Sequence, residues 1–158
     1  MTTTRPELQT TARHLLTEEG FADVVHLVMR DTEGIEQRFA ERIVDESLKF
    51  VATAASTRGA GLRPSKLVDL GWHALILHTS LYAKLCAAQG RFVHHIPEGP
   101  ATQRRDDATI QATLTAMREA GYVPDEYLWS RIADTELQLG DCYHSECTEG
   151  GSNCTAPE

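Results

Sequence analysis

The chain has 158 residues, 41% hydrophobic and 24% charged, which suits one globular domain with a core of its own. Its net charge of −8 argues against a nucleic-acid partner, because binding phosphates needs clustered lysines and arginines. The N-terminus lacks the apolar run of a secretory signal, and no stretch reaches the roughly 18 apolar residues of a membrane span. We therefore expect a cytoplasmic protein with no membrane partner, whose thiols stay reduced.

Apolar residues recur every three or four positions along most of the chain, which is the spacing of amphipathic helices. No alternation typical of strands persists. The predicted helices span residues 6–18, 21–31, 35–56, 66–88, 102–120 and 124–139. The sequence thus predicts an all-α, single-domain bundle of five to six helices over residues 1–140. An irregular tail that contains cysteines, residues 141–158, follows it.

Asp69 and His73 lie one turn apart in the predicted helix 66–88, so their side chains share a face and can meet. Both could bind one metal ion, because imidazole nitrogen and carboxylate oxygen are ordinary ligands of zinc and iron. Alternatively, Asp69 accepts the second N–H of His73 and fixes its tautomer, or it only complements the helix dipole on a solvated polar stripe. His78 points about 140° away from His73 on the helical wheel, so we exclude it from this site.

The loop after this helix carries two adjacent histidines, His94 and His95. Neighbouring residues of an extended segment point to opposite sides, so one of the two can turn inward while the other faces solvent. The flanking Phe92, Val93 and Ile96 suggest that the loop packs onto the domain. Periodicity does not show whether it reaches back to His73.

Three ordered motifs occur within PSKLVDLGWHALILHTSLYAKLCAAQGRFVHHIPEG, namely V-D-x-x-W-H, T-x-x-Y-x-x-x-C and G-R-F-x-H-H-x-P. This region resembles the core motif of the glycine-rich domain-containing protein-like family, in particular its short bacterial members without the glycine-rich extension. The resemblance covers about residues 40–130 and implies a largely helical fold, but no reaction. It implies the motif positions Asp69, Trp72, His73, Tyr82, Cys86, His94 and His95. The plant-like version of the motif has a second histidine where this chain has Leu75, which removes one candidate ligand.

The tail offers four soft ligands in thirteen residues, Cys142, His144, Cys147 and Cys154. A Cys3His set is an accepted zinc site, and a tail too polar to bury a core could be ordered by metal. Alternatively, the cysteines are incidental or redox-active in an unstructured terminus. In a third interpretation, Cys142 or Cys147 completes a site begun by His73 and His94, so one metal site or two stays open.

We therefore expect a small metal-binding protein, with zinc first and iron or copper as alternatives. A metalloenzyme of the hydrolase or non-haem oxygenase type is one alternative, since such a ligand set leaves coordination positions open. Another is an adaptor that recruits a protein partner through its acidic tail. The metal-free interpretation is a structural network of buried histidines bonded to Asp69 and Tyr82. The candidate metal ligands are Asp69, His73, His94, His95, Cys142, His144, Cys147 and Cys154.

Overall fold

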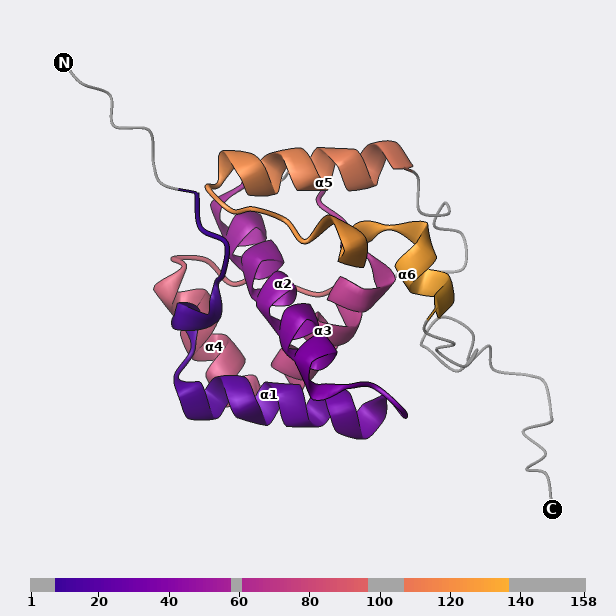
Figure 1. Ribbon diagram of the computed structural model, residues 1–158. Coiled ribbons are helices and arrows are strands. Elements are labelled where there is room, and N and C mark those ends of the chain that lie inside the picture. The colour runs from indigo at the N-terminus through magenta and orange to yellow at the C-terminus, as the bar shows by residue number, and fades with distance from the viewer. Residues whose placement is uncertain (1–7, 58–60, 97–106, 137–158) are drawn as a thin grey trace, which may run out of the picture.

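Residues 8–57, 61–96 and 107–136 are described by the computed structural model, and their regular elements are all helical (Figure 1). Within these residues the only β-type pairing is an isolated bridge between Gln9 and Tyr122. The elements are η1 (Arg13–Leu15), α1 (Glu18–Asp31), α2 (Gln37–Ser56), α3 (Lys66–Leu77), α4 (Thr79–Ala88), α5 (Asp107–Glu119), η2 (Glu126–Trp129) and α6 (Arg131–Glu136), where η marks a 3-10 turn. The predicted all-α, single-domain fold is confirmed.

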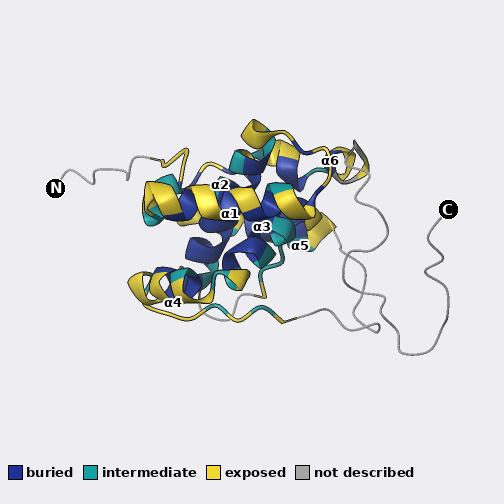
Figure 2. Ribbon diagram, turned by 90° about the horizontal axis from the view of Figure 1, so that it is seen from below, coloured by how far each residue is buried: buried dark blue, intermediate teal, exposed yellow. Residues whose placement is uncertain are grey.

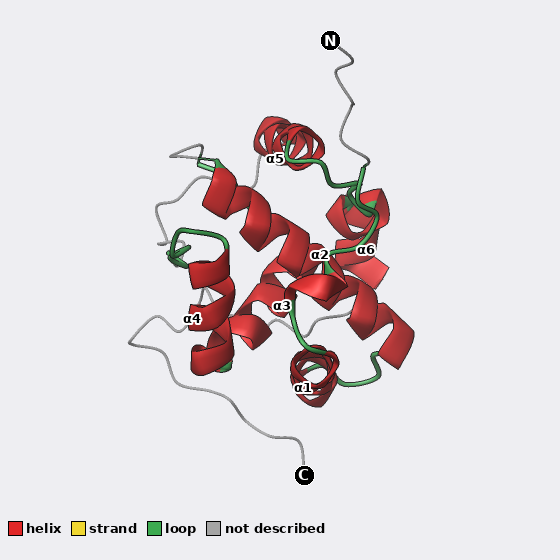
Figure 3. Ribbon diagram, turned by 90° about the vertical axis from the view of Figure 1, so that its left-hand side faces the viewer, coloured by secondary structure: helices red, strands yellow, loops and turns green. Residues whose placement is uncertain are grey.

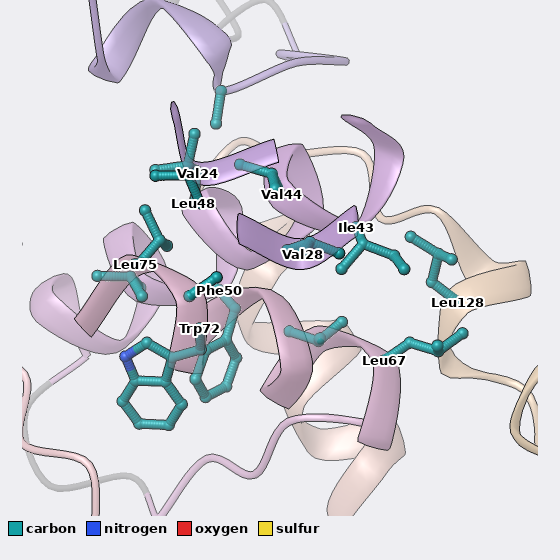
Figure 4. Close-up of a cluster of buried hydrophobic side chains, with 14 of the residues drawn as sticks. Val24, Val28, Ile43, Val44, Leu48, Phe50, Leu67, Trp72, Leu75 and Leu128 are labelled. Atoms are coloured by element: carbon teal, nitrogen blue, oxygen red, sulfur yellow. The ribbon is translucent and has the colours of Figure 1, made fainter. Parts of the chain in front are cut away.

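Helix α2 is the centre of the domain, with α1 and α5 lying across its two ends (Figure 1). Two neighbouring apolar stripes run along its sequence, Phe39–Ile43 and Val44–Leu48–Val51–Ala55, and its buried side chains accordingly lie on more than one face. Figure 4 shows Ile43, Val44 and Leu48 of α2 among buried side chains of the neighbouring helices. None of the helices in the described ranges is long and apolar enough to cross a membrane.

Helix α3 packs closely along α2 because glycine stands at the point of contact. A Cβ on Gly71 would lie 2.2 Å from Oγ of Ser47 and 3.0 Å from the main-chain oxygen of Ile43. The Ser65 side chain caps α3 by accepting from the Val68 N–H, and it donates to the main-chain oxygen of Leu128. Gly71 and His73 differ by about 200° around the helix, so packing this face on α2 turns the other face outward.

The predicted helix 66–88 is wrong as one element, since the structure divides it at His78 into α3 and α4. His78 has non-helical backbone angles, φ −83° and ψ 67°. No glycine or proline stands at 77–79 to mark this break.

The predicted helix 6–18 is also wrong, because only η1 is helical within residues 8–17 and α1 begins at Glu18. The main chain of Gln9 instead exchanges hydrogen bonds with a distant segment, accepting from Val123 and donating to Gly121. The predicted helix 124–139 consists of η2 and α6 in its described part. The predicted helix 102–120 is helical from Asp107, and residues 97–106 and 137–158 lie outside the described residues.

Candidate metal centre

Three side chains of the metal-ligating type meet at the outer face of α3. Asp69 and His73 lie one turn apart on α3, and His95 comes from the loop after α4. Nε2 of His95 lies 2.9 Å from Oδ1 of Asp69, and Nδ1 of His73 lies 3.3 Å from Oδ2. The two imidazole rings stand 4.3 Å apart between centroids. One ligand atom from each residue lies within 4.8 Å of the others, and we call these residues the Asp69 triad.

The break at His78 makes this meeting possible. In one continuous helix, Trp72 and Tyr82 would be separated by about 15 Å along the axis. With the chain turned at His78, the indole N–H of Trp72 donates to the hydroxyl of Tyr82 at 2.9 Å. The Tyr82 hydroxyl in turn donates to the main-chain oxygen of Val93 at 2.6 Å. The returning loop is therefore bonded directly to α4, and to α3 through the Tyr82 hydroxyl, two residues before His95.

The loop is also set by its start and by a ring contact. Gly90 has φ +80°, a left-handed conformation that favours glycine, and it ends α4. Two residues beyond Val93, the ring of His95 packs on Trp72 with centroids 4.5 Å apart. On the core side, Trp72 stands edge-on to Phe50 at 5.1 Å (Figure 4). His95 thus rests on a side chain that is itself anchored in the core.

The triad keeps Asp69 charged. Burial alone would raise the pKa of the Asp69 carboxyl, but hydrogen bonds and charge from His73 and His95 outweigh it and lower that pKa. The hydrogen bond to Asp69 raises the pKa of His73 more than burial lowers it. Burial also raises the pKa of Tyr82, so its hydroxyl stays protonated as a donor. A single carboxylate is thus shared by two imidazoles.

The triad is accessible to solvent from one side. The side chains of Asp69 and His73 are 35% and 36% exposed, and that of His95 is 17% exposed. Nδ1 of His73 also lies 2.8 Å from the main-chain oxygen of Asp69. Nδ1 of His73 is therefore engaged within α3, and Nε2 is its second ring nitrogen. The arrangement can thus offer nitrogen, nitrogen and oxygen donors to an ion that approaches from solvent.

Of the other predicted ligands, His94 alone falls within the described residues. His94 is exposed and its ring packs on Phe92 at 4.8 Å, outside the triad. His78 stands at the junction of α3 and α4, where its Nε2 is buried without a hydrogen-bond partner. Cys86 is buried and its thiol is free. The predicted ligands Cys142, His144, Cys147 and Cys154 lie outside the described residues.

A second polar cluster lies on α2, and the two charged groups at its centre are buried. Glu46 is fully buried and accepts hydrogen bonds from the Trp129 indole, the Asp125 main chain and Lys49. Lys49 also contacts Asp45 at 3.3 Å and the main-chain oxygen of Val123 at 3.0 Å. Burial raises the pKa of the Glu46 carboxyl, and the charge of Lys49 only partly offsets this. We call these five residues, Asp45, Glu46, Lys49, Asp125 and Trp129, the Glu46 cluster; sequence periodicity had marked none of them.

The Trp72–Tyr82 pair is the part of the site that the sequence did not reveal. Both side chains are buried, and the indole N–H and the hydroxyl are each hydrogen-bonded. Their mutual hydrogen bond depends on the break at His78, for which the sequence has no standard signal.

A protein-family model matches more than half of this chain. The search of curated proteins found no match, and neither did the search of solved structures. The predicted membership of the glycine-rich domain-containing protein-like family is wrong, because the family model that matches is a different one. The matching model covers residues 13–126, which contain the whole Asp69 triad and, except for Trp129, the Glu46 cluster. The chain belongs to the UCP032817-like family.

Proposed function

We propose that the chain binds one divalent transition-metal ion, zinc first and iron or copper as alternatives, at Asp69, His73 and His95. The observation that carries this is the convergence of three ligand-type side chains from two separate segments. In a tetrahedral zinc site with bonds of about 2.1 Å, donor atoms lie about 3.4 Å apart. Nε2 of His95 and Oδ1 of Asp69 are 2.9 Å apart, close to that spacing, and one ligand atom from each of the three residues lies within 4.8 Å of the others.

The position of the triad favours a functional site over a structural one. The hydrophobic core extends through α1 to α6 without using the triad. Structural zinc sites hold together regions that cannot fold without the ion, whereas this site sits on the outer face of a packed helix. Its solvent-exposed side leaves room for a further ligand beyond the three protein donors.

Zinc and iron both suit the donor set. Two imidazoles and one carboxylate match catalytic zinc sites, and they are also the set of non-haem iron enzymes, which keep positions open for water or substrate. This supports a metalloenzyme of the hydrolase or oxygenase type as the second candidate. Exchangeable water on bound iron, detected by spectroscopy, would favour it over a purely binding function. The adaptor alternative predicts no stoichiometric metal.

The test is metal analysis of the purified chain after loading and dialysis. We expect one equivalent of bound zinc in the wild type that is lost in His73→Ala and in His95→Ala, with affinity weaker by more than about 100-fold. His94→Ala is the matched control, because it removes the neighbouring imidazole outside the triad and should keep the metal. Circular dichroism checks that each variant is folded.

Two results would contradict the proposal. The first is a wild-type chain that retains no zinc, iron or copper after reconstitution, which would favour the metal-free hydrogen-bonded network. The second is stoichiometric metal that survives the loss of both His73 and His95, which would place the ion elsewhere in the chain.

A further inference from the structure

The Asp69 triad lies in a stretch of the chain that is poor in acidic residues. Of the 23 aspartates and glutamates, one falls within residues 47–96, and that one is Asp69. The same stretch holds six of the 15 lysines and arginines, although the net charge of the chain is −8. Three of these cations are exposed in the structure, Lys66, Lys84 and Arg91. The stretch is therefore positively charged in an acidic protein.

The helices of this stretch that carry the triad and its loop lie at one edge of the domain. Figure 3 shows α4 at that edge, beside α3. Figure 2 shows exposed residues on the outer side of α4 and along the loop that follows it. The triad is built from α3 and this loop, so it belongs to the same edge of the domain.

Lys66 is the only lysine or arginine on α3. It precedes Asp69 by three residues, a spacing at which the Cβ atoms of a helix lie about 5–6 Å apart. On the helical wheel it lies about 20° from His73, so it shares the face of α3 that carries the triad. The Lys66 side chain is exposed, and it makes no ion pair or hydrogen bond with any residue of the described ranges. Its ammonium group is thus available to a ligand bound at the triad.

A lysine at this position does not serve the helix itself. Lys66 is the first residue of α3, directly after the Ser65 cap. The N-terminal end of a helix carries a partial positive charge, which disfavours a cation in the first turn. A residue that opposes a local rule without a compensating contact in the fold is a candidate for a functional role. The charge of Lys66 is therefore better explained by a bound partner than by the stability of α3.

A divalent ion at the triad would leave the site positively charged. Asp69 contributes one negative charge, and the two histidines bind a metal ion as neutral imidazoles, so the ion and its three ligands carry a net charge of about +1. We infer that the site takes the carboxylate or phosphate group of a small anionic molecule, with one oxygen on the ion and another beside the Lys66 ammonium. This inference rests on the proposed function. Lysine binds such groups as a compact point charge, and the exposed side of the triad gives them access.

The experiment uses the full-length chain loaded with Co²⁺ in place of zinc, because the visible absorption of cobalt reports a change of its ligands. Acetate and inorganic phosphate are titrated separately at an ionic strength of about 0.15 M. We expect a saturable change in absorption, and the anion that binds more tightly identifies the group that the site prefers. In Lys66→Glu, the affinity for that anion should fall by about tenfold or more, because an attraction becomes a repulsion. Lys66→Arg keeps the charge and should stay within about threefold of the wild type.

The matched control is Arg38→Glu, which makes the same change in net charge at an exposed position of α2. Charges separated by more than a Debye length, about 8 Å at this ionic strength, are largely screened, so Arg38→Glu should leave the anion affinity within about twofold. Urea denaturation checks the fold of each variant. Lys66→Glu should be at least as stable as the wild type, because an acidic residue suits the first turn of a helix. Weaker anion binding by this variant would then not come from unfolding.

The remaining outcomes separate this inference from the proposed function. Cobalt that is held by His73 and His95, with an anion affinity equal in the wild type and Lys66→Glu, overturns the inference and leaves the proposed function standing. An absorption spectrum that neither anion changes also overturns it, and so does equal weakening in Lys66→Glu and Arg38→Glu. A chain that retains no metal ion contradicts the proposed function and the inference together.

Discussion

The domain holds two polar clusters that differ in burial and in the number of hydrogen-bond partners that each charged group has within the protein. In the Glu46 cluster, the carboxylate and the Lys49 ammonium are buried, and each makes several contacts inside the protein. In the Asp69 triad, one carboxylate serves two imidazoles and two of the three side chains are about one-third exposed. Both clusters combine a carboxylate with nitrogen groups. The central groups of the first are buried, whereas two of the three side chains of the second reach solvent.

This difference separates a stabilising role from a binding role. Buried charges are tolerated when their partners are complete, and removing one partner leaves an uncompensated charge. The Glu46 cluster ties α2 to the segment around Asp125 and Trp129. The pairs of Asp69 with His73 and His95 add little to the free energy of unfolding, because water screens ion pairs that are partly exposed. Variants of the first should therefore affect folding, and variants of the second should affect binding.

The largest expected effect is on the Glu46 cluster. Glu46→Leu removes the acceptor of the Trp129 indole and of the Asp125 main chain, and it takes one anion from buried Lys49. We expect the free energy of unfolding to fall by about 3–5 kcal/mol, measured by urea denaturation. Glu46→Gln is the control, because its amide oxygen can still accept from Trp129, and it should cost less. A Glu46→Leu variant within about 1 kcal/mol of the wild type would contradict a stabilising role.

The next effect concerns the face of α3 that packs on α2. Gly71→Ala places a Cβ 2.2 Å from Oγ of Ser47 and 2.9 Å from Cγ2 of Ile43, so the helix or its neighbours must shift. Overpacking of this kind costs about 1–3 kcal/mol in unfolding free energy. Lys66→Ala, at an exposed position of the same helix, is the control and should be nearly neutral. An unchanged midpoint in Gly71→Ala would mean that α2 and α3 are less tightly packed than the contact implies.

The sequence predicted the central helix and the helical face that carries Asp69 and His73. Helix α2 follows from its two apolar stripes, and the shared face of Asp69 and His73 follows from their spacing. Periodicity records burial along one helix, so it can identify such features. It also led to the expectation that one of His94 and His95 turns inward, although it could not say which.

Features that depend on tertiary contacts could not be predicted. The break at His78 occurs without glycine or proline, and it decides whether Trp72 and Tyr82 meet. The inward turn of His95 depends on the Tyr82–Val93 hydrogen bond, which joins residues eleven apart across that break. The Glu46 cluster joins residues about 80 positions apart, a separation that no local pattern can record. In each case a long-range partner outweighed local propensity.

A smaller effect should appear at the hydrogen bonds that hold the loop. Tyr82→Phe removes the acceptor of the Trp72 indole and the donor to Val93, leaving two part-buried polar groups without that partner. We expect a loss of about 1–3 kcal/mol in unfolding free energy, together with weaker zinc binding by about 10–100-fold, because His95 loses its positioning. Zinc titration with a competing chelator measures the second effect. A stability loss with unchanged zinc affinity would show that Tyr82 serves the core alone.

The smallest expected effect is a pH dependence that differs between the metal-free and metal-bound chain. The pKa of His73 is raised in the folded state, so its contribution to stability is fully present below the unfolded value of about 6.5. That contribution is lost as pH rises through the raised, folded value. The pKa of Asp69 is lowered, so its contribution is present above the unfolded value of about 4 and is lost as pH falls through the folded one.

In the metal-free chain, the stability difference between wild type and His73→Ala should therefore be largest between about pH 4 and 6.5, and it should shrink toward pH 8. Urea denaturation with a chelator present, repeated across that range, measures it. Zinc affinity should change in the opposite direction, rising with pH, because the metal competes with the proton for the imidazole. A stability difference that grows with pH without metal would mean that His73 is not paired with Asp69 in solution. A zinc affinity independent of pH would mean that His73 does not bind the ion.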